Sequence, residues 1–117
     1  MERHFRLRQS RDFARLRVEG RAYHSRWLLV SVMPNGLSHN RYGFVTSKQI
    51  GNAVARNHVR RLMREAVRLF HPQLLPGFDI VLVARQSLVE EPFAMFQRIV
   101  KELFDRAGVV KREGGAE

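Results

Sequence analysis

The feature that most constrains the fold is an amphipathic segment that separates two extended runs. Across residues 52–70 apolar side chains recur at the spacing of an α-helix, and the segment stops before Pro72. The run before it, residues 41–47, and the run after it, residues 78–84, are rich in β-branched and aromatic residues. The second run is almost continuously apolar, which indicates a strand buried on both faces. The chain therefore needs a sheet and a helical layer that covers it.

The other expected elements follow from capping and turn signals. They are a helix over residues 10–19 with Ser10 as its N-cap and Gly20 after its end, a strand over 27–33 that turns at 34–36 into an antiparallel hairpin with 41–47, and a helix from about Pro92 to Gly108. The order α-β-β-α-β-α predicts an α+β fold, an α-β sandwich in which helices flank a small central sheet.

The length of 117 residues fits one domain over residues 1–117. We expect residues 1–8 to be an irregular basic arm and residues 111–117 to be a tail that frays. Because the chain has no cysteine, disulfides, thiolate metal clusters and thiol nucleophiles are excluded. No apolar run approaches the ~20 residues of a membrane span, and the basic start lacks the apolar stretch of a signal peptide. A cytoplasmic protein that does not contact membranes is expected.

The charge of the chain points to a polyanionic partner. Lys and Arg number 21 against 11 Asp and Glu, which leaves a net charge of +10. All but three of the cations are arginine, whose planar fork of donors suits phosphate. A genome that prefers arginine codons would explain the ratio of arginine to lysine, but not the net charge. Such an excess normally faces a polyanion.

The helix over residues 52–70 gathers this charge on one side. On a helical wheel, an arc of about 140° holds only cationic and amide side chains: Arg56, Asn57, Arg60, Arg61, Arg64 and Arg68. The opposite arc predicts a core face made of Val59, Leu62, Met63, Ala66 and Phe70. A solvated face usually mixes both signs, whereas like charges four residues apart destabilise an isolated helix by about 0.2–0.5 kcal/mol per pair. Phosphate binding explains the cationic arc better than a solvated face does.

The residues just before this helix suit an anion as well. Gly51 can adopt a turn with positive φ, and Asn52 can cap the helix while its first N–H groups attract anions. One glycine is too few for the phosphate-binding loop of an ATP site, so that function is excluded.

The run from Lys48 to Glu65, KQIGNAVARNHVRRLMRE, resembles the signature of the protein subunit of bacterial ribonuclease P. That signature joins a lysine, a Gly-Asn-Ala-Val, an Arg-Asn and a basic pair followed by Arg-Glu or Arg-Gln. Further similarity extends over nearly the whole chain, at Arg6-Leu7, Asp12-Phe13, Gly20, Arg26, the strand with Gly43 and the strand from Asp79 to Arg85.

The resemblance implies a ribonucleoprotein that removes the 5′ leader of precursor tRNA. In that family the RNA subunit holds the catalytic Mg²⁺ ions and performs the hydrolysis, while the protein improves substrate affinity and lowers the metal requirement. The implied partners are the RNA subunit and the precursor tRNA leader, with no obligate protein partner. The implied fold has a small mixed sheet with a left-handed β-α-β crossover.

The resemblance also assigns site residues. Those that match the signature and would bind the RNA subunit are Lys48, Asn52, Arg56, Asn57, Arg60, Arg61 and Arg64; Arg68 joins them from the wheel alone. Phe13 either lines the leader cleft, where it matches an aromatic residue of the family, or is simply the core anchor of its short helix. Arg17 stands where relatives often have a second aromatic residue. We expect Arg17 to bind a leader phosphate from the same helix face as Phe13. Trp27 is either a stacking residue of that cleft or a core residue.

No residues indicate a catalytic site in the protein itself. The five histidines lack metal-site spacing, and there is no triad or acid cluster. We therefore expect no catalytic residue and no protein-held metal, and we expect Asp79 to pair with an arginine. The alternative function is a ribosomal or RNA-chaperone protein that binds RNA without an enzymatic role. The RNA that co-purifies with the chain separates these functions, since ribosomal RNA would favour the alternative.

Overall fold

The computed structural model describes residues 5–112. Within this range four strands form one sheet in the order β1-β2-β4-β3, and three α-helices pack on it. In chain order the elements are α1 (Ser10–Glu19), β1 (Arg21–His24), β2 (Leu28–Pro34), β3 (Arg41–Val45), α2 (Ala53–Phe70), β4 (Phe78–Ala84) and α3 (Phe93–Ala107), with short 3-10 turns η2 (Lys48–Ile50), η3 (His71–Gln73) and η4 (Gln86–Leu88). The predicted α+β sandwich is confirmed.

β4 lies inside the sheet, with β2 antiparallel on one side and β3 parallel on the other. β3, α2 and β4 thus form a parallel β-α-β unit. The predicted hairpin between β2 and β3 is wrong, because β4 separates them. The turn after β2 is tied to the start of β4 instead: Asn35 N donates to Gly77 O at 2.8 Å, and Asn35 Nδ2 donates to Asp79 Oδ1 at 3.0 Å.

The sheet contains one strand that the sequence analysis missed, β1. Its residues, Arg-Ala-Tyr-His, pair antiparallel with β2 at the edge of the sheet. Most of their side chains are exposed, so the segment lacks the apolar alternation that marks a half-buried strand. The element order is therefore α-β-β-β-α-β-α.

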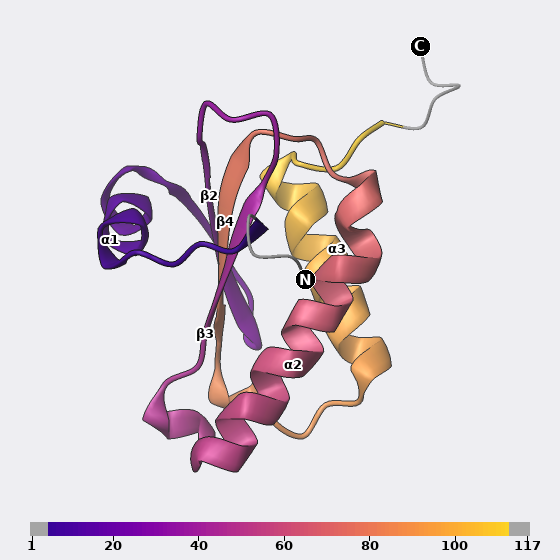
Figure 1. Ribbon diagram of the computed structural model, residues 1–117. Helices are drawn as coiled ribbons and strands as arrows, with labels where there is room; N and C mark the ends of the chain where they lie inside the picture. Colours follow the sequence, from indigo (N-terminus) through magenta and orange to yellow (C-terminus); the bar gives the residue numbers. More distant parts are fainter. Residues whose placement is uncertain (1–4, 113–117) are drawn as a thin grey trace.

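Both faces of β4 are covered, as its apolar run predicts. Ile80 and Leu82 belong to the larger core cluster, which α2 and α3 share. Val81 points to the other face and packs in a smaller cluster with Leu16 of α1. Figure 1 shows the resulting layers, with α1 on one side of the sheet and the α2–α3 pair on the other.

The ends of the two long helices follow the sequence signals. Asn52 is the N-cap of α2, and its Oδ1 accepts a hydrogen bond from Ala55 N at 2.9 Å. Gly51, with φ of 142°, makes the turn before it. α3 begins after Pro92 and ends before Gly108, whose φ of 74° is the left-handed conformation that favours glycine.

The described part of the basic arm is held against β3 rather than irregular. Leu7 N donates to Tyr42 O at 2.8 Å, and the Leu7 side chain is buried. The arm leads into α1, which spans the predicted residues 10–19, but the prediction that Ser10 is its N-cap is wrong. Gln9 holds the N-cap position without a side-chain hydrogen bond, and Ser10 is the first helical residue. Residues 1–4 of the arm lie outside the described residues.

The predicted tail begins with a residue that is held in place. Lys111 N donates to Gln73 O at 2.8 Å, so the expectation of fraying is wrong at this residue. Residues 113–117 lie outside the described residues. Between residues 5 and 112 no helix is long and apolar enough to cross a bilayer.

Candidate RNA interface

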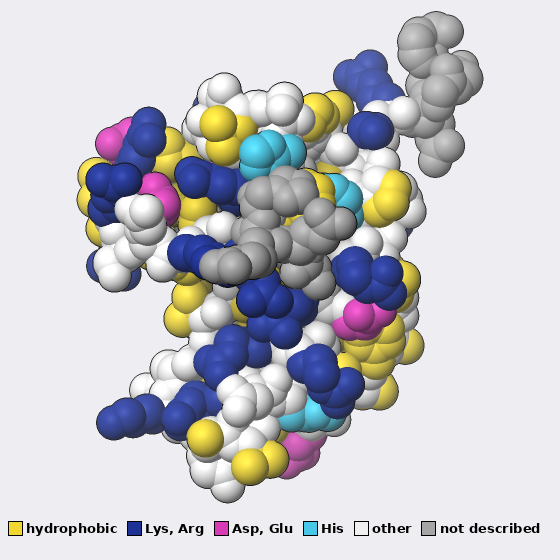
Figure 2. All heavy atoms as spheres, in the orientation of Figure 1, with side chains coloured by type: hydrophobic (Ala, Val, Ile, Leu, Met, Phe, Trp, Pro, Cys, Tyr) yellow, Lys and Arg dark blue, Asp and Glu magenta, His cyan; other side chains and the backbone are white. Residues whose placement is uncertain are grey.

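One face of α2 carries the cations that the helical wheel groups together. Its members, all at least partly exposed, are Arg56, Asn57, Arg60, Arg61, Arg64 and Arg68; we call them the cationic face. The opposite face packs on the core through Val59, Leu62, Met63, Ala66, Val67 and Phe70. Figure 2 shows dark blue side chains across the side of the molecule that α2 occupies, with few magenta ones among them. The predicted separation of a polar face from a core face is confirmed.

Neutral partners orient several side chains of the cationic face. Arg56 Nη1 donates to Gly51 O at 2.8 Å, and Arg60 Nη1 donates to Thr46 Oγ1 at 2.8 Å. Arg60 Nη2 also donates to Asn57 Oδ1. These contacts fix the guanidinium groups but do not compensate their charge, which stays available for phosphate.

Arg68 differs from the rest of the cationic face. Its Nε donates to Glu65 Oε1 at 3.1 Å, and the two side chains form an ion pair. This contact lowers the pKa of Glu65 and raises the pKa of Arg68. Because Arg68 already has a counter-charge, it attracts phosphate less than the wheel alone indicates.

Lys48 and Asn52 stand at the N-terminal end of α2. Lys48 is exposed at the start of η2, and the Asn52 side chain is occupied as the helix cap. The positive end of the helix dipole and the Lys48 ammonium group therefore lie at the same end of the cationic face.

A hollow of about 330 Å³ borders the cationic face. It is lined by basic, aromatic and small residues, none of them acidic: Arg6, Leu7, Arg8, Phe13, Tyr42, Gly43, Phe44, Arg60 and Arg64. Arg60 and Arg64 belong both to the hollow and to the cationic face, so the two surfaces are continuous. Burial lowers the pKa of Arg64, and the positive charges of Arg6 and Arg60 lower it further.

Phe13 joins the hollow from α1. A Cβ atom at Gly43 would lie 2.6 Å from Phe13 Cε1 and 2.7 Å from Phe13 Cζ, so the ring occupies space that only a glycine leaves open. Phe13 also packs against the smaller core cluster. It thus anchors α1 and presents part of its ring to the hollow, so the two roles considered for it are compatible.

An ion-pair chain holds α1 in this position. Arg41 Nε and Nη2 donate to the two carboxylate oxygens of Asp79 at 2.8 Å and 2.7 Å. The same Nη2 lies 3.9 Å from Asp12 Oδ1 in the first turn of α1. The hydrogen bond to Asp79 raises the pKa of Arg41. Asp79 is therefore the structural partner of an arginine, as the sequence predicts.

Arg17 does not join Phe13 in the hollow. Its side chain is exposed on α1 and is not among the lining residues. Phe13 and Leu16 are the side chains that α1 packs against the smaller core cluster, so the buried face of α1 is centred between them. At about 100° per residue, Arg17 lies at the edge of that face. The structure therefore does not bring Arg17 and Phe13 together in this hollow.

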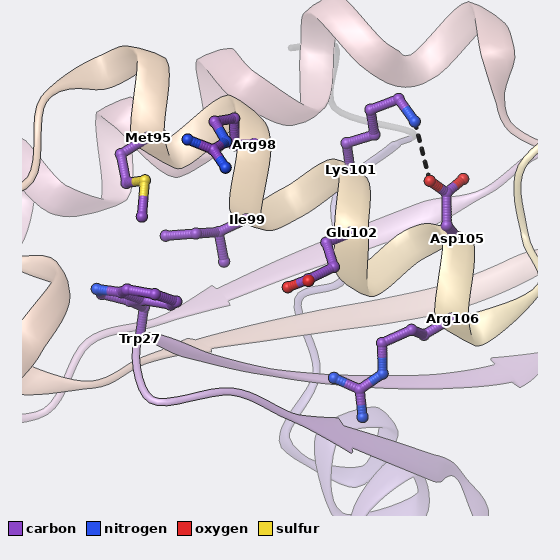
Figure 3. A pocket seen from close by; sticks show the side chains of 8 residues that line it. All are labelled: Trp27, Met95, Arg98, Ile99, Lys101, Glu102, Asp105 and Arg106. Carbon is purple, nitrogen blue, oxygen red and sulfur yellow. Dashed lines mark hydrogen bonds and ion pairs between the residues drawn. The ribbon is translucent and has the colours of Figure 1, made fainter.

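Trp27 lies on the other side of the sheet. Figure 3 shows its indole below α3, with Met95 and Ile99 pointing toward it. Its Nε1 donates to Glu91 Oε2 at 3.3 Å, and the Arg26 guanidinium lies 5.2 Å from the ring centroid. Trp27 is thus partly buried against the larger core cluster and does not line the hollow that contains Phe13.

The ribonuclease P family model matches residues 1–108. The chain belongs to the ribonuclease P protein family. The ribonuclease P protein component of Roseiflexus sp. (strain RS-1) is 44% identical to it over 95% of this chain and 92% of that protein. The component from Symbiobacterium thermophilum is 37% identical over 97% of this chain and 100% of the relative. The resemblance drawn from the signature is confirmed.

Solved ribonuclease P proteins share the fold. The protein from Staphylococcus aureus is 29% identical, with a TM-score of 0.85 over 92% of this chain and 98% of that one. The protein from Thermotoga maritima is 30% identical, with a TM-score of 0.80 over 86% and 96% of the two chains. None of these relatives favours the alternative of a ribosomal or RNA-chaperone protein.

Sequence reasoning missed part of the hollow of this ribonuclease P protein. Arg6 and Arg8 were assigned to an irregular arm, yet both line the hollow, together with the partly buried Phe44. The Arg6-Leu7 pair, which is part of the resemblance, was the available signal. The described residues of the chain contain no group of three or more His, Asp or Glu that could hold a metal ion.

Proposed function

We propose that this chain is the protein subunit of a bacterial ribonuclease P holoenzyme and helps an RNA subunit to remove the 5′ leader of precursor tRNA. The observation that carries the proposal is the continuity of the cationic face of α2 with the hollow beside it. Continuous surfaces allow one small protein to contact both the RNA subunit and the substrate.

The cationic face is the surface for the RNA subunit. Arg56, Arg60 and Arg64 are spaced four residues apart, which places each about 6 Å from the next along the helix axis. Each can therefore reach a different phosphate. Phosphate contacts of this kind fix position and orientation and carry little sequence information, as a subunit interface on folded RNA requires.

The hollow is the surface for the single-stranded leader. Phe13 offers a ring on which a base can stack, and stacking tolerates any base. The arginines around the ring attract the leader backbone. A site of this composition binds leaders of different sequence with similar affinity.

Catalysis belongs to the RNA subunit in this proposal. Mg²⁺ ions held by that RNA supply the hydrolytic chemistry. The chain itself contributes positive charge, which reduces phosphate repulsion between the RNA subunit and the substrate.

The test is substrate discrimination by the reconstituted holoenzyme. Affinity is measured for precursor tRNA with a leader of about five nucleotides and for mature tRNA, with the RNA subunit alone as reference. We expect the chain to favour the leader-bearing RNA by about tenfold, the equivalent of one stacked base. Phe13→Leu should reduce this preference, whereas Arg17→Ala on the same helix should leave it intact. Equal preference with and without the chain would contradict the leader role.

A further inference from the structure

The helix that brings Phe13 to the hollow, α1, packs on the sheet through few side chains. Of the three α-helices between residues 5 and 112, it is the one on its side of the sheet (Figure 1). Leu16 is the only buried residue of α1, and Phe13 packs beside it in the smaller core cluster. Because apolar packing is non-directional, two side chains alone leave the position of a helix poorly fixed.

Two consecutive residues of α1 meet the sheet in two adjacent rows. Phe13 faces Gly43 of β3, and Asp12 faces Arg41 of the same strand. Since side chains alternate along a strand, positions 41 and 43 point to the same side of the sheet. The residue of β4 in register with Arg41 is Asp79. A charged row thus runs beside the row in which Phe13 meets Gly43, and α1 lies across both.

The charged row is anchored in the sheet. Arg41 Nε and Nη2 donate to the two carboxylate oxygens of Asp79 at 2.8 Å and 2.7 Å, and the Asp79 side chain is only 8% exposed. Asn35 Nδ2 donates to Asp79 Oδ1 as well, at 3.0 Å. Two parallel hydrogen bonds fix both the position and the plane of a guanidinium group. The charge of Arg41 is therefore held in a set place where α1 passes.

The same guanidinium group attracts α1. Arg41 Nη2 lies 3.9 Å from Asp12 Oδ1, and both side chains are partly shielded from water. The hydrogen bond to Asp79 raises the pKa of Arg41, and the negative charge of Asp12 raises it further. Among residues 5–112 this is the one ion pair that joins α1 to the sheet, since the pair of Arg15 and Glu19 lies within the helix.

We propose that Arg41 is a positioning residue for leader binding: through Asp12 it sets where α1 lies on the sheet and so holds the Phe13 ring against Gly43. Asp12 directly precedes Phe13, so the ring moves when the carboxylate moves. Arg41 does not line the hollow and therefore acts through α1 rather than on the RNA. The inference rests on the proposed function and deepens it, because it names the contact that places the stacking surface.

The first experiment measures the position of the ring in the free chain by NMR. A Cβ atom at Gly43 would lie 2.6 Å from Phe13 Cε1, so an α proton of this glycine points at the ring. Nuclear Overhauser contacts between that proton and the ring protons should lose most of their intensity in Asp12→Asn, which keeps the shape of the side chain and removes its charge. Asp12→Glu restores the charge and should retain the contacts.

The matched control is Glu19→Gln, because it removes a carboxylate from the same helix and breaks the exposed ion pair with Arg15. It should leave the contacts between Phe13 and Gly43 unchanged. Circular dichroism verifies that every variant is folded. Contacts that persist at full intensity in Asp12→Asn, or that fall equally in Glu19→Gln, would overturn the proposal.

A second role of Asp12 has to be separated from this one. Asp12 lies in the first turn of α1, where a carboxylate stabilises the helix through its dipole. Arg41→Lys leaves α1 unchanged, but an ammonium group lacks the fork that spans two carboxylates. Arg41→Lys should therefore weaken the ring contacts by itself, and Asp12→Asn should weaken them little further in that background. Equal effects of Asp12→Asn in both backgrounds would contradict action through Arg41.

The second experiment uses the reconstituted holoenzyme. Asp12→Asn should lose most of the roughly tenfold preference for leader-bearing over mature tRNA, with unchanged affinity for mature tRNA, whereas Glu19→Gln should keep the preference. A displaced ring with an intact preference would overturn the role of Arg41 in leader binding. If the wild-type holoenzyme shows no leader preference while the ring contacts still depend on Asp12, the proposed function fails and the positioning of Phe13 by Arg41 stands.

Discussion

At the scale of single residues, the contact between Phe13 and Gly43 sets one wall of the hollow. Gly43→Ala would place a methyl group 2.6 Å from Phe13 Cε1, so the ring must move. We expect the free energy of unfolding in urea to fall by about 1–3 kcal/mol, the usual cost of overpacking. Leader discrimination by the holoenzyme should fall with it, because the stacking surface is displaced.

The control for this prediction is the same substitution in a Phe13→Ala background. Without the ring, the nearest remaining neighbour of the new methyl group is Val81 Cγ2 at 3.3 Å, so Gly43→Ala should destabilise the protein less than it does in the wild type, and the two losses are not additive. Additive losses would show that Gly43→Ala acts through some other contact.

The same residues show what sequence reasoning can reach. Phe13 was found through the resemblance, and Gly43 carried a usable signal, because a glycine inside a strand often marks close approach of a neighbour. Arg17 was expected beside Phe13 because a spacing of four residues puts two side chains on one side of a helix. That spacing does not say where the buried face of the helix is centred. That centre depends on how α1 packs on the sheet.

At the scale of elements, the proposed function gives the two faces of α2 different roles, with core packing on one face and RNA binding on the other. Met63 is fully buried, so Met63→Ala should lower the free energy of unfolding by about 2–5 kcal/mol. Arg61→Ala, on the exposed face, should change it by less than about 0.5 kcal/mol. Leu62 is only partly buried, so Leu62→Ala should lower the free energy of unfolding by less than Met63→Ala does. Urea denaturation of the three variants checks this order; a large loss for Arg61→Ala would show that the cationic face is structural.

His71, directly after α2, makes stability depend on pH. Its Nδ1 lies 2.7 Å from Tyr42 Oη; burial lowers the pKa of His71, and the charge of Lys111 lowers it further. A histidine with a lower pKa in the folded state contributes stability above its unfolded pKa of about 6.5, and this is lost as pH falls through the folded value.

We therefore expect the free energy of unfolding of the wild type to decline more than that of His71→Gln when the pH drops from about 7 to about 5. His58→Gln is the control, because His58 is exposed on α2. Urea denaturation at several pH values is the measurement. Parallel declines for the wild type and His71→Gln would refute this role.

The arrangement of the strands was only partly predictable. Each strand with apolar character was found, but β1 is short and polar and its pairing depends on β2. The expected hairpin failed because β4 is the most thoroughly buried strand and takes the place between β2 and β3. Local turn signals cannot reveal that preference, since it arises from contacts between segments far apart in the sequence.

At the scale of the whole molecule, the net charge of +10 is spread unevenly over the surface. Neighbouring basic side chains are concentrated on α2 and in the hollow. Elsewhere several basic side chains form ion pairs with acidic ones. The helical wheel predicted the first surface. The hollow could not be predicted from the sequence because the arm, β3 and α2 meet only in the folded chain.

The most direct test of the central claim is the Mg²⁺ dependence of precursor tRNA cleavage by a bacterial ribonuclease P RNA, with and without the RNA-free chain. In the proposed function the chain contributes positive charge where the RNA subunit and the substrate meet, so it should replace part of the Mg²⁺ that screens them. We predict a clearly lower Mg²⁺ midpoint with the chain present and no cleavage by the chain alone. An unchanged midpoint, or cleavage by the RNA-free chain, would contradict the account.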